Sequence, residues 1–200
     1  MRTGACIIAL ALLYALALVI SAKAETDPCG NRSQRDQKEA ELRATVADTL
    51  KEIRSGDASS FLNRVDDRGI WVSGDLITVT ELKRQFRKKE ELYCLLFLSS
   101  CLSSTKLPGD LQTQWKLSYA EWLTKNVSPK VEIDMGYGGN EEPCAANVSI
   151  RAKEKPQSMP ETFELGFDYR GGRWLFRRTP AYPTGIASRT SRHLGDLTWQ

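Results

Sequence analysis

The spacing of apolar residues divides the chain into two parts. In the first, Leu42, Val46 and Leu50 recur every four residues and Ile53 follows three later, which is the period of one helix face. From Lys130 onward apolar and polar residues alternate, as they do in strands with one buried and one wet face. Helices followed by an antiparallel sheet predict an α+β fold, with the helices on one face of a curved sheet.

Turn-forming residues predict where the first helices end. Gly56 suits the end of the first helix, since glycine accepts the left-handed conformation found there. Asp57 suits the cap of a short second helix through Phe61. Residues 66–69 predict a turn, and residues 70–72 predict a short strand after it.

A third helix is predicted after another turn at residues 73–75. Either Thr78 or Thr80 can cap it, and its apolar face is expected to continue as far as Phe97. In residues 111–125 the aromatic spacing favours a helix without excluding a strand.

Alternation predicts three or four strands in the second part of the chain. Residues 131–136, 146–151 and 163–169 alternate, and residues 170–173 form a hairpin turn into a returning strand at 174–176. With the short earlier strand, a sheet of about four to five strands is expected.

The N-terminus has the three parts of a secretory signal peptide. Arg2 supplies the positive charge, residues 5–20 form the apolar run, and Ala22 and Ala24 give small residues before a cleavage site at Glu25. An uncleaved anchor is the alternative, but the run has 16 residues where a spanning helix needs about 20. The mature protein is therefore expected to be exported, periplasmic or extracellular, with no membrane attachment after cleavage.

Cleavage after residue 24 leaves 176 of the 200 residues, the length of one domain. We expect a polar leader at 25–36, a single α+β domain at 37–180 and a loosely ordered tail at 181–200. The signal peptide removes two basic residues, so 26 basic residues face 25 acidic ones in the mature chain. A net charge this small does not favour nucleic acid as a partner.

The mature chain has four cysteines, an even number that predicts two disulfides in an oxidising compartment. Three pairings remain open, with a preference for Cys94–Cys101 together with Cys29–Cys144. Seven residues of helix would hold Cys94 and Cys101 roughly 10 Å apart, so this pairing requires the helix to end between them. The spacings contain no short Cys pair of the kind that zinc sites use, so no metal site is predicted. The sequence has no nucleotide-binding fingerprint either, and no cofactor is predicted.

Three segments give the chain a resemblance to the nuclear transport factor 2-like superfamily, which includes ketosteroid isomerase and scytalone dehydratase. They are Ser55-Gly56-Asp57-Ala58 with the short helix after it, the strand 70–72 before a long helix, and the closing strands with Phe163-Glu164-Leu165 and residues 172–176. The resemblance covers roughly residues 37–180. It implies a cone-shaped fold with a pocket between the helices and the concave face of the sheet.

The resemblance also implies which residue types would act if the protein were an enzyme. Isomerases of the superfamily use an aspartate base and a hydrogen-bond donor in an apolar pocket. Tyr93 and Tyr137 are the candidate donors here, and the only histidine, His193, falls in the expected tail. The candidate bases, which also fit turns or the wet face of a strand, are Asp66, Asp67, Asp75 and Asp134.

Two further groups of residues are candidates for binding. A basic cluster at residues 83–89 fits either a solvated helix face or a docking patch for an acidic partner. Several aromatic residues fit either the core or the lining of a pocket. The candidate pocket residues are Trp71, Phe86, Tyr93, Trp122 and Tyr137.

These patterns favour an exported, non-enzymatic binding module for a small apolar ligand or a protein partner. The first alternative is a cofactor-free isomerase or dehydratase that uses a pocket aspartate and tyrosine. The second is a secreted inhibitor or immunity-type protein that uses the basic cluster. Superfamily members often dimerise through the outer sheet face, which here would be polar, so monomer and homodimer both remain open.

Overall fold

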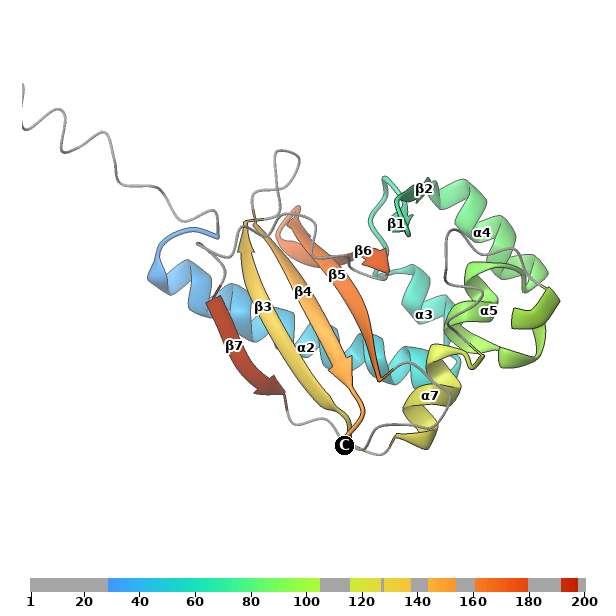
Figure 1. The fold of residues 1–200 in the computed structure, drawn as a ribbon. Coiled ribbons are helices and arrows are strands. Elements are labelled where there is room, and N and C mark those ends of the chain that lie inside the picture. The colour runs from blue at the N-terminus through green and yellow to red at the C-terminus, as the bar shows by residue number, and fades with distance from the viewer. Residues whose placement is uncertain are drawn as a thin grey trace, which may run out of the picture.

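The computed structural model describes residues 29–104, 116–126, 128–137, 144–153, 161–179 and 192–197. The predicted signal peptide lies outside this range. Helices and strands are both present, so the α+β class is confirmed (Figure 1). The helices are α2 (Arg32–Ser55), α3 (Ala58–Leu62), α4 (Val79–Lys88), α5 (Leu92–Phe97) and α7 (Tyr119–Lys125), with a 3₁₀ helix η1 (Ser99–Ser104). The strands are β1 (Ile70–Val72), β2 (Asp75–Ile77), β3 (Lys130–Tyr137), β4 (Cys144–Arg151), β5 (Thr162–Arg170), β6 (Arg173–Thr179) and β7 (Arg192–Leu197).

The strands form one mixed sheet of seven strands in the order β2-β1-β6-β5-β4-β3-β7. Only the pairing of β1 with β6 is parallel among these neighbours. The sheet is larger than the expected four to five strands, because β2 and β7 each add a strand at one of its two edges. The turn was expected at residues 73–75, but Asp75 already belongs to β2, which pairs with β1 across a two-residue loop whose Ser73 and Gly74 both have positive φ.

The expectation of a loosely ordered tail is wrong for residues 192–197, which form β7 against β3. The sequence of this strand shows no alternation of apolar and polar residues. The strand forms because β3 would otherwise be an open sheet edge, whose backbone groups pair with it. The rest of the tail lies outside the described residues, as does the side chain of His193.

Helix α2 crosses behind the central strands in Figure 1 and packs on the sheet. Its predicted stripe of Leu42, Val46, Leu50 and Ile53 is fully buried, and the Trp174 indole on β6 donates a hydrogen bond of 2.8 Å to the Lys38 carbonyl. The helix begins at Arg32, inside the segment expected to be a polar leader. It begins there because the Asn31 and Gln34 side chains form a reciprocal cap.

The predicted third helix is interrupted between α4 and α5. Thr78 caps α4, as one of the two expected alternatives, through a hydrogen bond from the Glu81 amide. The helix then ends at Lys89, which adopts a left-handed conformation with φ of 56°. Residues 119–125 are helical, which resolves the ambiguity in that part of the described chain.

Both preferred disulfides are present. Cys29 pairs with Cys144 across 115 residues, and Cys94 pairs with Cys101 across seven. The second pair forms because α5 ends at Phe97 and the chain turns into η1 before Cys101. The two bonds fit an oxidising environment.

One continuous core lies between the helices and the sheet. Trp122 and Tyr119 of α7 are fully buried against Phe163 of β5, with ring centroids 5.0 Å and 4.3 Å from the phenylalanine ring. The Tyr119 hydroxyl also forms a hydrogen bond of 3.0 Å with the Thr179 hydroxyl. Among the described helices, none combines the length and the apolar character that a membrane crossing requires.

Candidate functional site

The structure places the five predicted pocket residues in different surroundings. Phe86 and Tyr93 lie together, with ring centroids 5.7 Å apart. Trp122 is a fully buried core residue of α7. Trp71 lies on β1 with the guanidinium of Arg177 5.9 Å from its ring. The backbone of Tyr137 ends β3, and its side chain lies outside the described residues.

Phe86 is the member of this group that lines an open groove on the surface. The groove lies between α3 and α4, at the end of the molecule where Figure 1 shows the helices gathered beyond the sheet. Its volume is about 600 Å³. The lining residues are Ala58, Ser59, Leu62, Thr80, Lys83, Phe86 and Arg87.

Local sequence explains why two helices flank this groove. Asp57 caps α3 by accepting hydrogen bonds of 3.1 Å from the Ser60 amide and 2.7 Å from the Ser60 hydroxyl. Helix α4 turns Thr80, Lys83 and Arg87 to one side, since these positions are three and four residues apart. The result is an apolar surface with hydroxyl groups and two cations at its rim.

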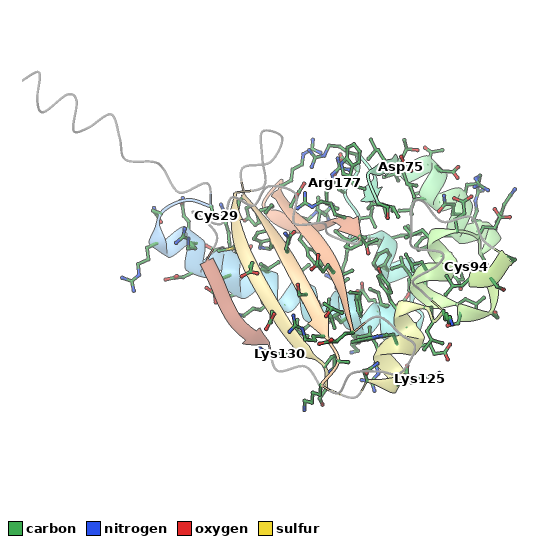
Figure 2. The ribbon with its side chains drawn as sticks, in the orientation of Figure 1. Cys29, Asp75, Cys94, Lys125, Lys130 and Arg177 are labelled. Carbon is green, nitrogen blue, oxygen red and sulfur yellow. A yellow bond between two sulfur atoms is a disulfide. The ribbon has the colours of Figure 1, made fainter. Side chains whose placement is uncertain are left out.

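The groove has a firm aromatic base. The Phe86 ring is 7% exposed, and its centroid lies 6.0 Å from that of Phe61 and 5.7 Å from that of Phe97. Phe61 is fully buried and also packs on Phe176 of β6, 5.2 Å away. The Cys94–Cys101 disulfide, on the helical side of Figure 2, closes the segment that carries Phe97. These contacts fix the position of the aromatic residues at the base of the groove.

The basic cluster at residues 83–89 contains side chains that form ion pairs and side chains that do not. The Arg84 guanidinium contacts the carboxylates of Glu81, Glu90 and Glu91, the closest at 2.5 Å and the others at 2.8 and 3.3 Å. Hydrogen bonds from Arg84 lower the pKa of Glu81 to about 2. Lys83 and Arg87 are exposed, and neither forms an ion pair within the described residues. The groove therefore presents two cations to solvent.

A second group of charges surrounds Arg177 of β6, which Figure 2 labels. The Asp66 carboxylate is fully buried and accepts two hydrogen bonds of 2.8 Å from the Arg68 guanidinium. The Asp168 side chain is 5% exposed, and its oxygens lie 2.9 Å from Arg178 and 3.5 Å from Arg68. We call Asp66, Arg68, Asp168, Arg177 and Arg178 the arginine–aspartate network.

The network ties the loop before β1 to β5 and β6. Arg177 donates a hydrogen bond of 2.5 Å to the Gly69 carbonyl and lies in a bulge of β6, opposite Gly166 and Phe167. Burial raises the pKa of Asp66, but hydrogen bonds from Arg68 outweigh it and leave that pKa below its usual value. Burial raises the pKa of Asp168, and the nearby guanidiniums of Arg178, Arg177 and Arg68 only partly oppose the rise.

The candidate catalytic aspartates are not gathered at the groove. Asp66 is held by Arg68, and the 81% exposed Asp67 pairs with Arg170 at 2.7 Å. Asp75 is exposed at the start of β2, and Asp134 lies on β3. The candidate donor Tyr93 packs against Phe86 and Phe97 on the helical side.

No metal-binding group of three His, Cys, Asp or Glu side chains occurs within the described ranges. Comparisons with protein-family models, with curated proteins and with solved structures give no match for the chain.

Sequence patterns missed most of the groove and most of the network. Ala58, Leu62 and Thr80 have no distinctive chemistry, and only tertiary packing brings α3 beside α4. Asp66 was among the candidate bases, and the other visible signal of the network was the adjacent pair Arg177 and Arg178. Two charged residues in a row break the alternation of a strand, which is a sign of a bulge.

Proposed function

We propose that the mature chain is an exported, non-enzymatic binding module and that the α3–α4 groove is its binding site. The observation that carries the proposal is the pairing of an apolar floor with two exposed cations that form no ion pair within the described residues. Such a site favours a ligand that combines an apolar part with anionic groups.

Export is part of this proposal. The predicted signal peptide and the two disulfides support a periplasmic or extracellular location, since both features belong to proteins that mature outside the cytoplasm. The mature domain would then meet its ligand outside the cell or in the periplasm.

A nuclear transport factor 2-like cone is also a proposal. Its support is the order of elements, with α2 and α3 before the β1–β2 hairpin, then α4, α5 and α7, and then the β3–β6 meander, which β7 follows. Along one face of the sheet the space that such a cone would use for a pocket holds the buried side chains of Tyr119, Trp122 and Phe163. For this reason we place the binding site in the surface groove.

The test uses 1-anilinonaphthalene-8-sulfonate, a fluorescent probe that joins an apolar ring system to an anionic group. The mature protein should enhance its fluorescence, and the double variant Lys83→Glu/Arg87→Glu should weaken binding on the order of tenfold. Lys88→Glu is the matched control, because Lys88 is exposed on the same helix turn but does not line the groove.

A groove-filling variant, Ala58→Trp, should abolish the signal by occupying the apolar floor. Near-ultraviolet circular dichroism of each variant confirms that its tertiary packing is intact, since partly unfolded proteins also bind this probe. Equal binding by the wild type, the double variant and Ala58→Trp would refute the groove as the site.

A further inference from the structure

We propose that the ligand is an acidic amphipathic helix of a protein partner, bound along the α3–α4 groove. This inference rests on the proposed function of the groove and names the class of partner. Its basis is the open shape of the groove, the helical character of both walls and the spacing of the two cations at the rim.

The open shape argues against a small molecule. Pockets for small ligands bury about 70–90% of the ligand surface. Here the lining comes from two neighbouring helices, and the groove is open to solvent. An apolar small molecule would leave much of its surface in water, whereas a folded segment of a protein brings its own polar outer face.

The helical walls argue against an extended peptide. An extended chain binds by adding a strand to a sheet edge, where free backbone N–H and C=O groups pair with it. Backbone groups of α3 and α4 are occupied by their helical turns and by the caps Asp57 and Thr78, so side chains must carry most of the recognition. A partner helix meets that condition, because its own backbone is satisfied and its side chains form ridges that fit a groove.

The cation spacing gives the pattern of the partner. Lys83 and Arg87 are four residues apart on α4, which corresponds to about 6 Å along the helix axis. Two carboxylates four residues apart on a partner helix have the same separation. Apolar residues beside them, at three- and four-residue spacing, would contact Leu62, Ala58 and Phe86 on the floor.

The test is a charge swap between the protein and a synthetic helical peptide. The acidic peptide is alanine-based, with leucines at helical spacing and two glutamates four residues apart beside them, and a second peptide has lysines in place of the glutamates. Binding to the full mature protein is followed by fluorescence anisotropy of the labelled peptides. We expect the acidic peptide to bind the wild type, and the lysine peptide to bind on the order of tenfold more weakly.

The Lys83→Glu/Arg87→Glu variant should reverse this preference, while Lys88→Glu should retain it. Reversal is decisive because a misfolded variant would lose both peptides. If neither peptide binds while the anilinonaphthalene probe still binds in a Lys83- and Arg87-dependent way, the helix inference fails and the proposed function stands. If the probe fails as well, both fail. Binding to anionic phosphatidylglycerol vesicles with the same charge dependence, in place of the peptide, would overturn the protein partner.

Discussion

Asp66 is a carboxylate that the fold buries completely and pairs with Arg68 through two hydrogen bonds. Removing one partner of a buried pair is costly, because the other is left without compensation. The Asp66 backbone amide also donates to the Phe176 carbonyl at 3.1 Å, so the same residue fixes the loop to β6 through its main chain. Its role is therefore structural.

Replacing Asp66 with Asn should cost about 3 kcal/mol of unfolding free energy at neutral pH. The folded pKa of Asp66 is lowered, so its stabilisation is fully present above the unfolded value of about 3.9 and is lost as pH falls through the folded pKa. The difference between wild type and variant should therefore narrow in acid. Urea denaturation between neutral pH and about pH 3 measures it.

The matched control is Asp67→Asn, whose side chain is exposed and whose ion pair with Arg170 lies at the surface. It should cost less than about 1 kcal/mol. A stability difference for Asp66→Asn that stays constant down to low pH would contradict the assignment of a buried, ionised carboxylate.

Two glycines with similar backbone angles separate conformational strain from steric contact. Gly69 has φ of 96° and Gly74 has φ of 94°, but a Cβ at Gly69 would lie 2.0 Å from the Ile77 carbonyl oxygen, whereas Gly74 is open. Gly74→Ala should therefore cost about 1–2 kcal/mol. Gly69→Ala should cost at least about 2 kcal/mol more. Equal costs in thermal or urea unfolding would show that the β1–β2 hairpin does not approach Gly69 so closely.

At the scale of elements, the spacing of apolar residues predicted the features that depend on the local sequence of a single segment. The buried stripe of α2, the Gly56 stop and the four strands of the meander follow from local spacing and turn residues. The break between α4 and α5 did not, because the apolar face continues past it. At this break the Arg84 guanidinium pairs with Glu81, Glu90 and Glu91, which favours a turn. The spacing of apolar residues does not indicate that turn.

The edge strands and the candidate site could not be predicted from local sequence patterns, because both depend on contacts between distant segments. β2 is three residues long, and β7 shows no alternation, so each depends on a neighbouring strand. The groove depends on the packing of α3 beside α4, which long-range contacts such as Phe61 with Phe176 determine. Sequence patterns identified its cations as one cluster but did not separate Arg84, which is paired, from Lys83 and Arg87.

At the scale of the whole molecule, the two disulfides should contribute unequally. Cys29–Cys144 ties the start of α2 to β4 and closes 115 residues, while Cys94–Cys101 closes seven. Loop-closure entropy gives about 5 kcal/mol for the first and about 2 kcal/mol for the second. The double variants Cys29→Ser/Cys144→Ser and Cys94→Ser/Cys101→Ser should lose stability in that order in urea unfolding. The reverse order would contradict a role for Cys29–Cys144 as the main covalent constraint.

The most direct test of the groove as binding site is a two-dimensional ¹H–¹⁵N NMR titration of the mature protein with 1-anilinonaphthalene-8-sulfonate. The groove predicts chemical-shift changes concentrated in residues 58–62 and 79–88, with α7 and the meander largely unchanged. Lys83→Glu/Arg87→Glu should remove those changes at the same probe concentration. Shifts centred on the arginine–aspartate network or on the outer sheet face would contradict the assignment.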